Sequence, residues 1–155
     1  FCDWYIELVK PRLFDKENPT GKTAQYVLTY VLSNTMKLLH PFMPFITEEI
    51  WQHLPHEGES IMISEWPEYD EKLNFTKDVE SMELIMQSIS AIRNRRAEMN
   101  VPPSKKAKVI IVTDKTDVFE QGTVFFEKLA SASEAVVQTD KSGISDNAVN
   151  VVVQT

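Results

Sequence analysis

The chain has 155 residues and a formal net charge of -7, and 43% of its residues are hydrophobic and 25% charged. This length fits one domain, or one domain with a small appendix, and the composition excludes the intrinsically disordered and membrane-spanning classes. No apolar run approaches the roughly 18 residues needed to cross a bilayer, and the acidic, aromatic start FCDWYIELVK is unlike a signal peptide. We therefore expect a cytoplasmic protein without a membrane partner.

Cys2 is the only cysteine. An internal disulfide and a cysteine-built metal cage are thus excluded, and a reducing compartment is the simplest interpretation. The chain starts without methionine inside a helical repeat and ends in the β-rich stretch 149–153. We expect a piece of a longer protein whose catalytic centre lies elsewhere, so no catalytic residue is assigned.

Three helices are predicted in the first part of the chain. Residues spaced three and four apart, among them Trp4, indicate a first helix that Pro11 is expected to end. Apolar residues at the same spacing predict a second helix over residues 22–39. Pro44 suits the first turn of a third helix, which is expected to end at Pro55.

Aromatic residues at helical spacing usually belong to a core, and we predict this role for Trp51 and Phe45. The whole buried face of the third helix is predicted to consist of Phe45, Ile46, Ile50 and Leu54. Trp4 differs because it lies in an end helix close to Lys10 and Arg12, so it is also a candidate for stacking on a nucleic-acid base.

The longest helix is predicted over residues 76–100, where apolar residues form one stripe at about 100° per residue. The residues of this stripe are Val79, Met82, Ile85, Met86 and Ile89. Toward the C-terminus the same stripe continues into Arg93, Arg96 and Asn100 instead of further apolar side chains. Two prolines then end the helix.

Beyond the prolines the pattern becomes mixed. Short β-branched runs predict strands at residues 108–113, 135–139 and 148–155, and residues 117–130 are typical of a helix.

The predicted fold class is mainly α. Residues 1–102 are expected to form an antiparallel helical bundle, and residues 103–155 a small α/β appendix of order β-α-β-β. The boundary is placed where the helical periodicity stops, near residues 101–106.

Positive charge is concentrated at this boundary. Residues 93–108 hold six basic residues and one acid, a net charge of +5, whereas the rest of the chain holds 10 basic and 22 acidic residues, a net charge of -12. Net acidity argues against a general nucleic-acid binder, but the segregation of charge permits a local one.

Two short motifs have simpler structural explanations. Gly21-Lys22-Thr23 resembles the end of a phosphate-binding loop, but Lys16 stands where that motif needs a glycine. His53 and His56 are two of the four ligands that a structural zinc requires, with no cysteine or third histidine nearby. We predict surface or capping histidines and no metal site.

Arg93 and Arg96 lie in line with a buried face, which leaves two interpretations open. In the first, they pair with carboxylates of the bundle such as Glu48 or Glu49, at a substantial desolvation cost. In the second, they contact RNA phosphates or a base edge, because a guanidinium group matches phosphate oxygens with two hydrogen bonds.

Two stretches resemble a known family. LLHPFMPFITEEIWQHLP, residues 38–55, is similar to a segment of the valyl-, leucyl- and isoleucyl-tRNA synthetases. IRNRRAEMNVPPSKKAKV, residues 92–109, resembles the anticodon-binding region of valyl-tRNA synthetases in particular, and the opening FCDWYIELVKPRLF is similar to the start of that region. The resemblance covers most of residues 1–112.

The resemblance implies a tRNA-reading module of an enzyme that uses ATP to attach valine to its tRNA. No cofactor is expected in this part, because ATP would bind in a catalytic domain whose HIGH-like and KMSKS-like motifs are absent here. The family's editing domain and C-terminal coiled coil are absent as well. The implied partners are a valine-accepting tRNA and the catalytic domain of the same chain, and a monomer is expected.

The implied mechanism is recognition at a distance: the bundle holds the anticodon loop while the acceptor end reaches an active site elsewhere. Lys105 and Lys106 would contact phosphates, although a solvated charged turn is the alternative for both. The predicted tRNA-binding residues are Trp4, Lys10, Arg12, Arg93, Asn94, Arg96, Lys105 and Lys106.

Two other functions stay open. One is an acidic helical interaction module whose basic segment docks a protein partner or another domain. Steep weakening of RNA binding by salt would argue against it. The other is the equivalent domain of an isoleucyl- or leucyl-tRNA synthetase, which the VPPSKK segment disfavours.

Overall fold

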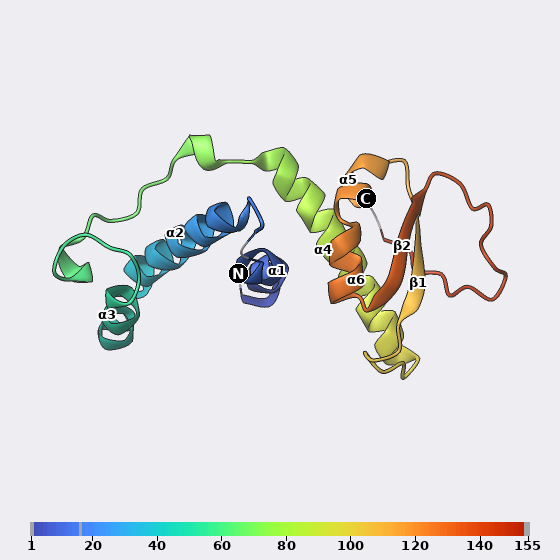
Figure 1. Ribbon diagram of the computed structural model, residues 1–155, viewed down its shortest axis with the longest axis horizontal. Coiled ribbons are helices and arrows are strands. Elements are labelled where there is room, and N and C mark those ends of the chain that lie inside the picture. Colours follow the sequence, from blue (N-terminus) through green and yellow to red (C-terminus); the bar gives the residue numbers. More distant parts are fainter. Residues whose placement is uncertain (1, 16, 154–155) are drawn as a thin grey trace. The chain divides into compact units, whose positions relative to one another are not determined.

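The computed structural model describes residues 2–15 and 17–153, and its contacts divide the chain into two compact units, Phe1–Glu71 and Lys72–Thr155. Most of the regular structure is helical, and a small sheet lies in the second unit (Figure 1), so the predicted mainly α class with a small α/β part is confirmed. None of the helices within these ranges is both long and apolar enough to cross a lipid bilayer.

The first unit begins with a helix that continues past its proline. A π-helical turn, η1 (Cys2–Ile6), leads into α1 (Glu7–Phe14), and Pro11 lies inside α1. The prediction that Pro11 ends this helix is wrong. A proline removes one backbone hydrogen bond, and here the helix closes one turn later, where the Asp15 N–H donates to the Pro11 carbonyl at 3.2 Å.

Helix α2 (Gly21–Leu39) confirms the predicted second helix and packs against α1. Gly21 is buried at this junction, and a Cβ atom there would lie 2.8 Å from the carbonyl oxygen of Arg12. Gly21 therefore permits the close approach of two backbones, which explains the glycine of the Gly21-Lys22-Thr23 motif without a phosphate.

A small core joins α2, α3 (Pro44–Gln52) and the 3-10 turn η2 (Ile61–Ile63). Its members are Met36, Trp51 and Ile61, with Leu32 and Ile50 packed against them. Thr47 is buried on the same side of α3. Its hydroxyl lies 2.8 Å from His40 Nδ1 and donates to the Met43 carbonyl at 2.8 Å, so burial leaves the hydroxyl satisfied.

The buried face of α3 differs from the predicted one. Trp51 is 2% exposed, which confirms its core role, but Phe45 is 90% exposed and Ile46 is 49% exposed. Thr47 and Trp51 lie one turn apart and occupy the inward positions, which turns Phe45 and Ile46 away from the core. The prediction that Phe45 and Ile46 are buried is therefore wrong.

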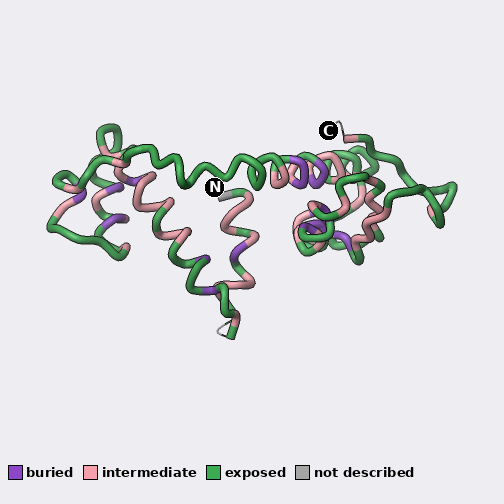
Figure 2. The backbone as a smooth tube through the Cα atoms, turned by 90° about the horizontal axis from the view of Figure 1, so that it is seen from above, coloured by how far each residue is buried: buried purple, intermediate pink, exposed green. Residues whose placement is uncertain are grey.

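Helix α4 (Thr76–Glu98) confirms the predicted long helix. Its buried residues are Leu84, Ile85, Ser88 and Ile89, which lie in the middle of the helix. Figure 2 shows the backbone coloured by burial. Val79 of the predicted stripe is instead 51% exposed. The contacts group α4 with the second unit. The predicted domain boundary at residue 102 is based on the change of sequence periodicity, and it stays a prediction.

The sheet of the second unit has two parallel strands, β1 (Ala107–Val112) and β2 (Ala132–Gln138). The third predicted strand does not form in the part of it that the structure describes, because residues 148–153 have no regular secondary structure. Residues 154 and 155 lie outside the described residues. β-Branched side chains favour a strand only where a neighbouring strand completes its hydrogen bonds.

Two helices form the crossover that parallel neighbours require. The single helix predicted over residues 117–130 is divided into α5 (Thr116–Gln121) and α6 (Thr123–Leu129), both of which contact β2. Gly122 between them is buried, and a Cβ atom there would lie 2.7 Å from the Cδ1 atom of Ile85 in α4. Glycine disfavours a continuous helix and leaves room for α4.

Candidate nucleic-acid interface

The predicted tRNA-binding residues fall in both compact units. Trp4, Lys10 and Arg12 belong to the first unit. The second unit contains the other five: Arg93, Asn94, Arg96, Lys105 and Lys106.

Helix α4 ends in a motif that reverses the chain. Asn100 adopts the left-handed region with φ 53°, which asparagine tolerates better than most residues. The Val101 N–H donates to the Arg96 carbonyl at 2.9 Å, and the Asn100 N–H donates to the Ala97 carbonyl at 3.0 Å. These bonds define a Schellman motif, which brings the following segment back toward the last turn of α4.

Arg96 connects that last turn to the segment that follows it. Residues 102–105 form a β-turn closed by the Lys105 N–H, which donates to the Pro102 carbonyl at 3.0 Å. Nη2 of Arg96 donates to the carbonyls at both ends of this turn, those of Pro102 at 3.2 Å and of Lys105. The half-buried Arg96 side chain thus holds the turn against α4.

Arg93 lies one turn earlier on the same side of α4. Its Nε donates to the carbonyl of Leu129, the last residue of α6. A cation suits this place, because the last carbonyls of a helix lack intrahelical partners and carry partial negative charge. The strands begin side by side, with Ala107 opposite Ala132. The two arginines therefore hold the segments that lead into these strands against α4.

The polar side chains around this place are exposed. Asn94, Lys105 and Lys106 face solvent, and exposed Arg95 pairs with Glu98 at 2.9 Å. Such a surface ion pair contributes little free energy, so Arg95 stays available to a stronger anion. We define the basic end of the second unit as Arg93, Asn94, Arg95, Arg96, Lys105 and Lys106.

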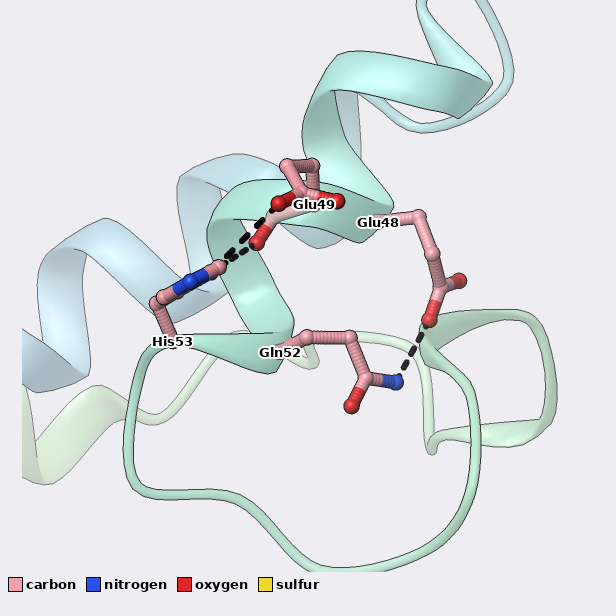
Figure 3. Close-up of polar contacts among 4 residues, drawn as sticks. All are labelled: Glu48, Glu49, Gln52 and His53. Atoms are coloured by element: carbon pink, nitrogen blue, oxygen red, sulfur yellow. Dashed lines mark hydrogen bonds and ion pairs between the residues drawn. The ribbon is translucent and has the colours of Figure 1, made fainter.

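The carboxylates considered as partners of these arginines are engaged within the first unit (Figure 3). Glu48 accepts hydrogen bonds from Gln52 and from Ser60, each at 2.8 Å. These bonds, that from Gln52 first, lower the pKa of the Glu48 carboxyl. Glu49 lies 3.9 Å from Nδ1 of His53. Arg96, in contrast, donates to backbone carbonyls.

In the first unit Arg12 also has a structural contact. Its Nε donates to Thr20 Oγ1 at 2.9 Å and its Nη2 to the Thr20 carbonyl at 3.3 Å, which ties α1 to the start of α2. Lys10 is exposed and pairs with Glu7 on the surface of α1. Trp4 is half-buried in η1.

The two histidines that were candidate metal ligands both bond to the local backbone. Nδ1 of His53 donates to the Glu49 carbonyl at 2.8 Å, and Nδ1 of His56 donates to the Leu54 carbonyl at 2.8 Å. The His56 ring also lies 4.1 Å from the ring of Trp51. Among the residues that the structure describes, no three His, Cys, Asp or Glu side chains are grouped to hold a metal ion.

Comparison with known proteins places these features in a family. Residues 1–111 match the family model described as the anticodon-binding domain of tRNA ligase. The chain is 51% identical over 156 residues to a valine–tRNA ligase of Clostridium perfringens, which covers 99% of this chain and 18% of that protein.

Two further relatives are also valine–tRNA ligases. The valine–tRNA ligase of Clostridium acetobutylicum is 49% identical over 156 residues, with 99% of this chain and 18% of the relative covered. That of Bacillus cereus is 47% identical over 143 residues, with 90% and 16% covered. The chain thus spans less than a fifth of the length of these relatives. Since the family model matches well over half of its residues, the chain belongs to the family of anticodon-binding domains of tRNA ligases.

Proposed function

We propose that this chain is the anticodon-binding region of a valine–tRNA ligase, an enzyme that uses ATP to attach valine to its tRNA. The support is the family match together with identities of 51% and 49% over nearly the whole chain to valine–tRNA ligases. ATP binding, aminoacylation and editing belong to the rest of the parent protein. This region supplies RNA recognition and no catalytic residue.

The proposal of RNA binding rests on the basic end of the second unit. The basic end collects guanidinium and ammonium groups at the end of α4, where Arg93 and Arg96 bond to the segments that lead into the two strands, in a chain with a net charge of -7. These groups bind phosphate oxygens. The acidic remainder repels polyanions that do not fit the basic end, which limits indiscriminate binding.

Base recognition needs groups that can reach an unstacked nucleotide. Anticodon bases are splayed out in a loop, where their edges and faces are accessible. Exposed Asn94 offers one acceptor and two donors to a base edge, and half-buried Trp4 is the proposed stacking residue. Lys10 and Arg12 add cations for phosphates from the first unit.

The parent protein would act as a cytoplasmic monomer in which this region and the catalytic domain hold two ends of one tRNA. A valine-accepting tRNA is the proposed substrate class, because the relatives are named for valine. Binding of the anticodon would deliver the acceptor end to the distant active site.

The specificity of this assignment is tested by competition between tRNAs. The chain is expected to bind a valine-accepting tRNA more tightly than isoleucine- or leucine-accepting tRNAs, because their anticodon bases differ. Fluorescence anisotropy of labelled valine-accepting tRNA, displaced by each unlabelled tRNA at one fixed salt concentration, measures the ratio. Equal affinities would contradict anticodon reading, and a preference for another acceptor would move the assignment to that relative.

Protein docking is the second candidate function, favoured by the apolar corner between α2 and α3. Phe42 and Phe45 at this corner are 82% and 90% exposed. Electrostatic attraction between exposed charges is strongest at low salt. The absence of tRNA binding even at low salt would therefore favour docking over RNA recognition.

A further inference from the structure

The hydrogen bonds of Arg96 point to a role different from a phosphate contact. Resting on the proposed RNA-binding function, we propose that Arg96 is a positioning residue. It holds the 102–105 turn against α4, so that Lys105 and Lys106 are presented together to RNA phosphates. Its effect on RNA affinity passes through those two lysines.

The turn depends on a side chain because it has few hydrogen bonds of its own. Pro102 and Pro103 lack backbone N–H groups, and the turn is closed by one backbone hydrogen bond, from Lys105 to Pro102. Arg96 adds two bonds, one at each end of the turn. The turn is therefore held at both ends from the last turn of α4.

Arg96 and the lysines differ in how the protein engages their donors, because Arg96 bonds to the protein through one of its three nitrogens. Nη2 of a guanidinium group carries two hydrogens, and Arg96 directs this nitrogen at the carbonyls of Pro102 and Lys105. Within the described residues, the ammonium groups of Lys105 and Lys106 have neither a hydrogen bond nor an ion pair, and both residues are exposed. An incoming phosphate meets the lysines without displacing a protein bond.

Arg93 supports the same interpretation. It donates to the Leu129 carbonyl and so attaches the approach to β2 in the way that Arg96 attaches the approach to β1. Two arginines three residues apart thus hold in place the segments that lead into the two strands, and Lys105 and Lys106 lie in one of these segments. Their alignment with the buried face of α4 follows from this structural role.

A double-mutant cycle tests the proposal with the whole chain. The variants are Arg96→Gln, the pair Lys105→Ala/Lys106→Ala, and all three changes together. Affinity for a valine-accepting tRNA is measured at several salt concentrations. We expect Arg96→Gln alone to weaken binding about tenfold, a coupling typical of residues in one network, and to lower the salt slope by about one.

The effect of Arg96→Gln on affinity should depend on whether Lys105 and Lys106 are present. In the Lys105→Ala/Lys106→Ala background, Arg96→Gln should change the affinity less than about twofold and leave the salt slope unchanged, since coupled residues are not additive. The proposal is overturned if Arg96→Gln weakens binding equally in both backgrounds and lowers the slope by a further ~0.7, the value for one lost single-strand contact. It is also overturned if the two lysines prove irrelevant to binding.

Misfolding of a variant and failure of the proposed function can each be distinguished from the predicted effect of Arg96→Gln. Circular dichroism checks each variant, and if Arg96→Gln fails to fold, Arg96→Lys replaces it, since lysine keeps the charge but lacks the planar fork. A loss from a smaller folded fraction leaves the salt slope unchanged, whereas loss through the lysines lowers it. Failure of the proposed function looks different again, because the unsubstituted chain would then show no salt-dependent tRNA binding.

Discussion

Replacing Lys105 and Lys106 together by alanine should lower the affinity for a valine-accepting tRNA by about 10- to 30-fold near physiological salt, as expected for two lost phosphate contacts. Both ammonium groups are exposed at the basic end, beside a turn that Arg96 holds in place. The slope of log affinity against log salt should become shallower by about 1.4, because each single-strand contact contributes about 0.7. Anisotropy titrations at four or five salt concentrations measure both quantities.

A matched pair of lysines controls for net charge. Lys115 follows β1 and Lys141 follows β2, so both exposed side chains lie beyond the opposite ends of the strands. Lys115→Ala/Lys141→Ala removes the same charge and should change the affinity less than about twofold, since it removes no phosphate contact. Equal losses in the two double variants would mean that RNA responds to overall charge and not to the basic end.

The second large effect concerns stability. Trp51→Ala should destabilise the first unit by about 3 to 5 kcal/mol, the usual range for a large aromatic side chain removed from a core. The Trp51 side chain is 2% exposed and packs with Met36 and Ile61 at the junction of α2, α3 and η2. Urea unfolding followed by tryptophan fluorescence measures the change, and all three tryptophans lie in the first unit, so this signal reports on that unit alone.

Trp66→Ala is the corresponding control. Trp66 is 57% exposed, and a surface substitution usually changes the free energy of unfolding by less than about 1 kcal/mol. Trp4 and Trp51 still report unfolding in this variant. Similar costs for Trp51→Ala and Trp66→Ala would contradict the assignment of Trp51 to the core.

Helical periodicity was sufficient to predict α2 and α4 because each helix is long enough for its apolar spacing to repeat several times. It was insufficient for the face of α3. A threonine normally counts as polar, yet buried Thr47 lies 2.8 Å from His40 Nδ1 and donates to the Met43 carbonyl. The inward positions could not be identified without knowing these partners, and Phe45 was placed in the core incorrectly.

The α/β part shows that local strand preference is not sufficient to predict a strand. The β-branched runs predicted β1 and β2, because both strands find a partner. The run at the C-terminal end is also rich in β-branched residues, but its described residues, 148–153, are not paired with a strand. Gly122 likewise divides the crossover helix at the place where Ile85 approaches, and a contact between residues so distant in the chain leaves no local pattern.

The candidate site was predictable in its charge but not in its bonds. The concentration of basic residues at residues 93–108 is visible in the sequence and is present in the structure as the basic end. Arg93 and Arg96 donate hydrogen bonds to the backbone carbonyls of Leu129, Pro102 and Lys105. Every residue has a backbone carbonyl, so no residue type marks these partners, and side-chain patterns pointed to carboxylates or phosphates instead.

The most direct test of anticodon reading separates the two ends of the tRNA. Labelled valine-accepting tRNA bound to the chain is challenged with its isolated anticodon arm and, separately, with its isolated acceptor arm at the same ionic strength. The anticodon arm should displace the tRNA with nearly the affinity of the whole molecule, while the acceptor arm should not compete. Displacement by the acceptor arm as effective as that by the anticodon arm would contradict recognition of the anticodon by this chain.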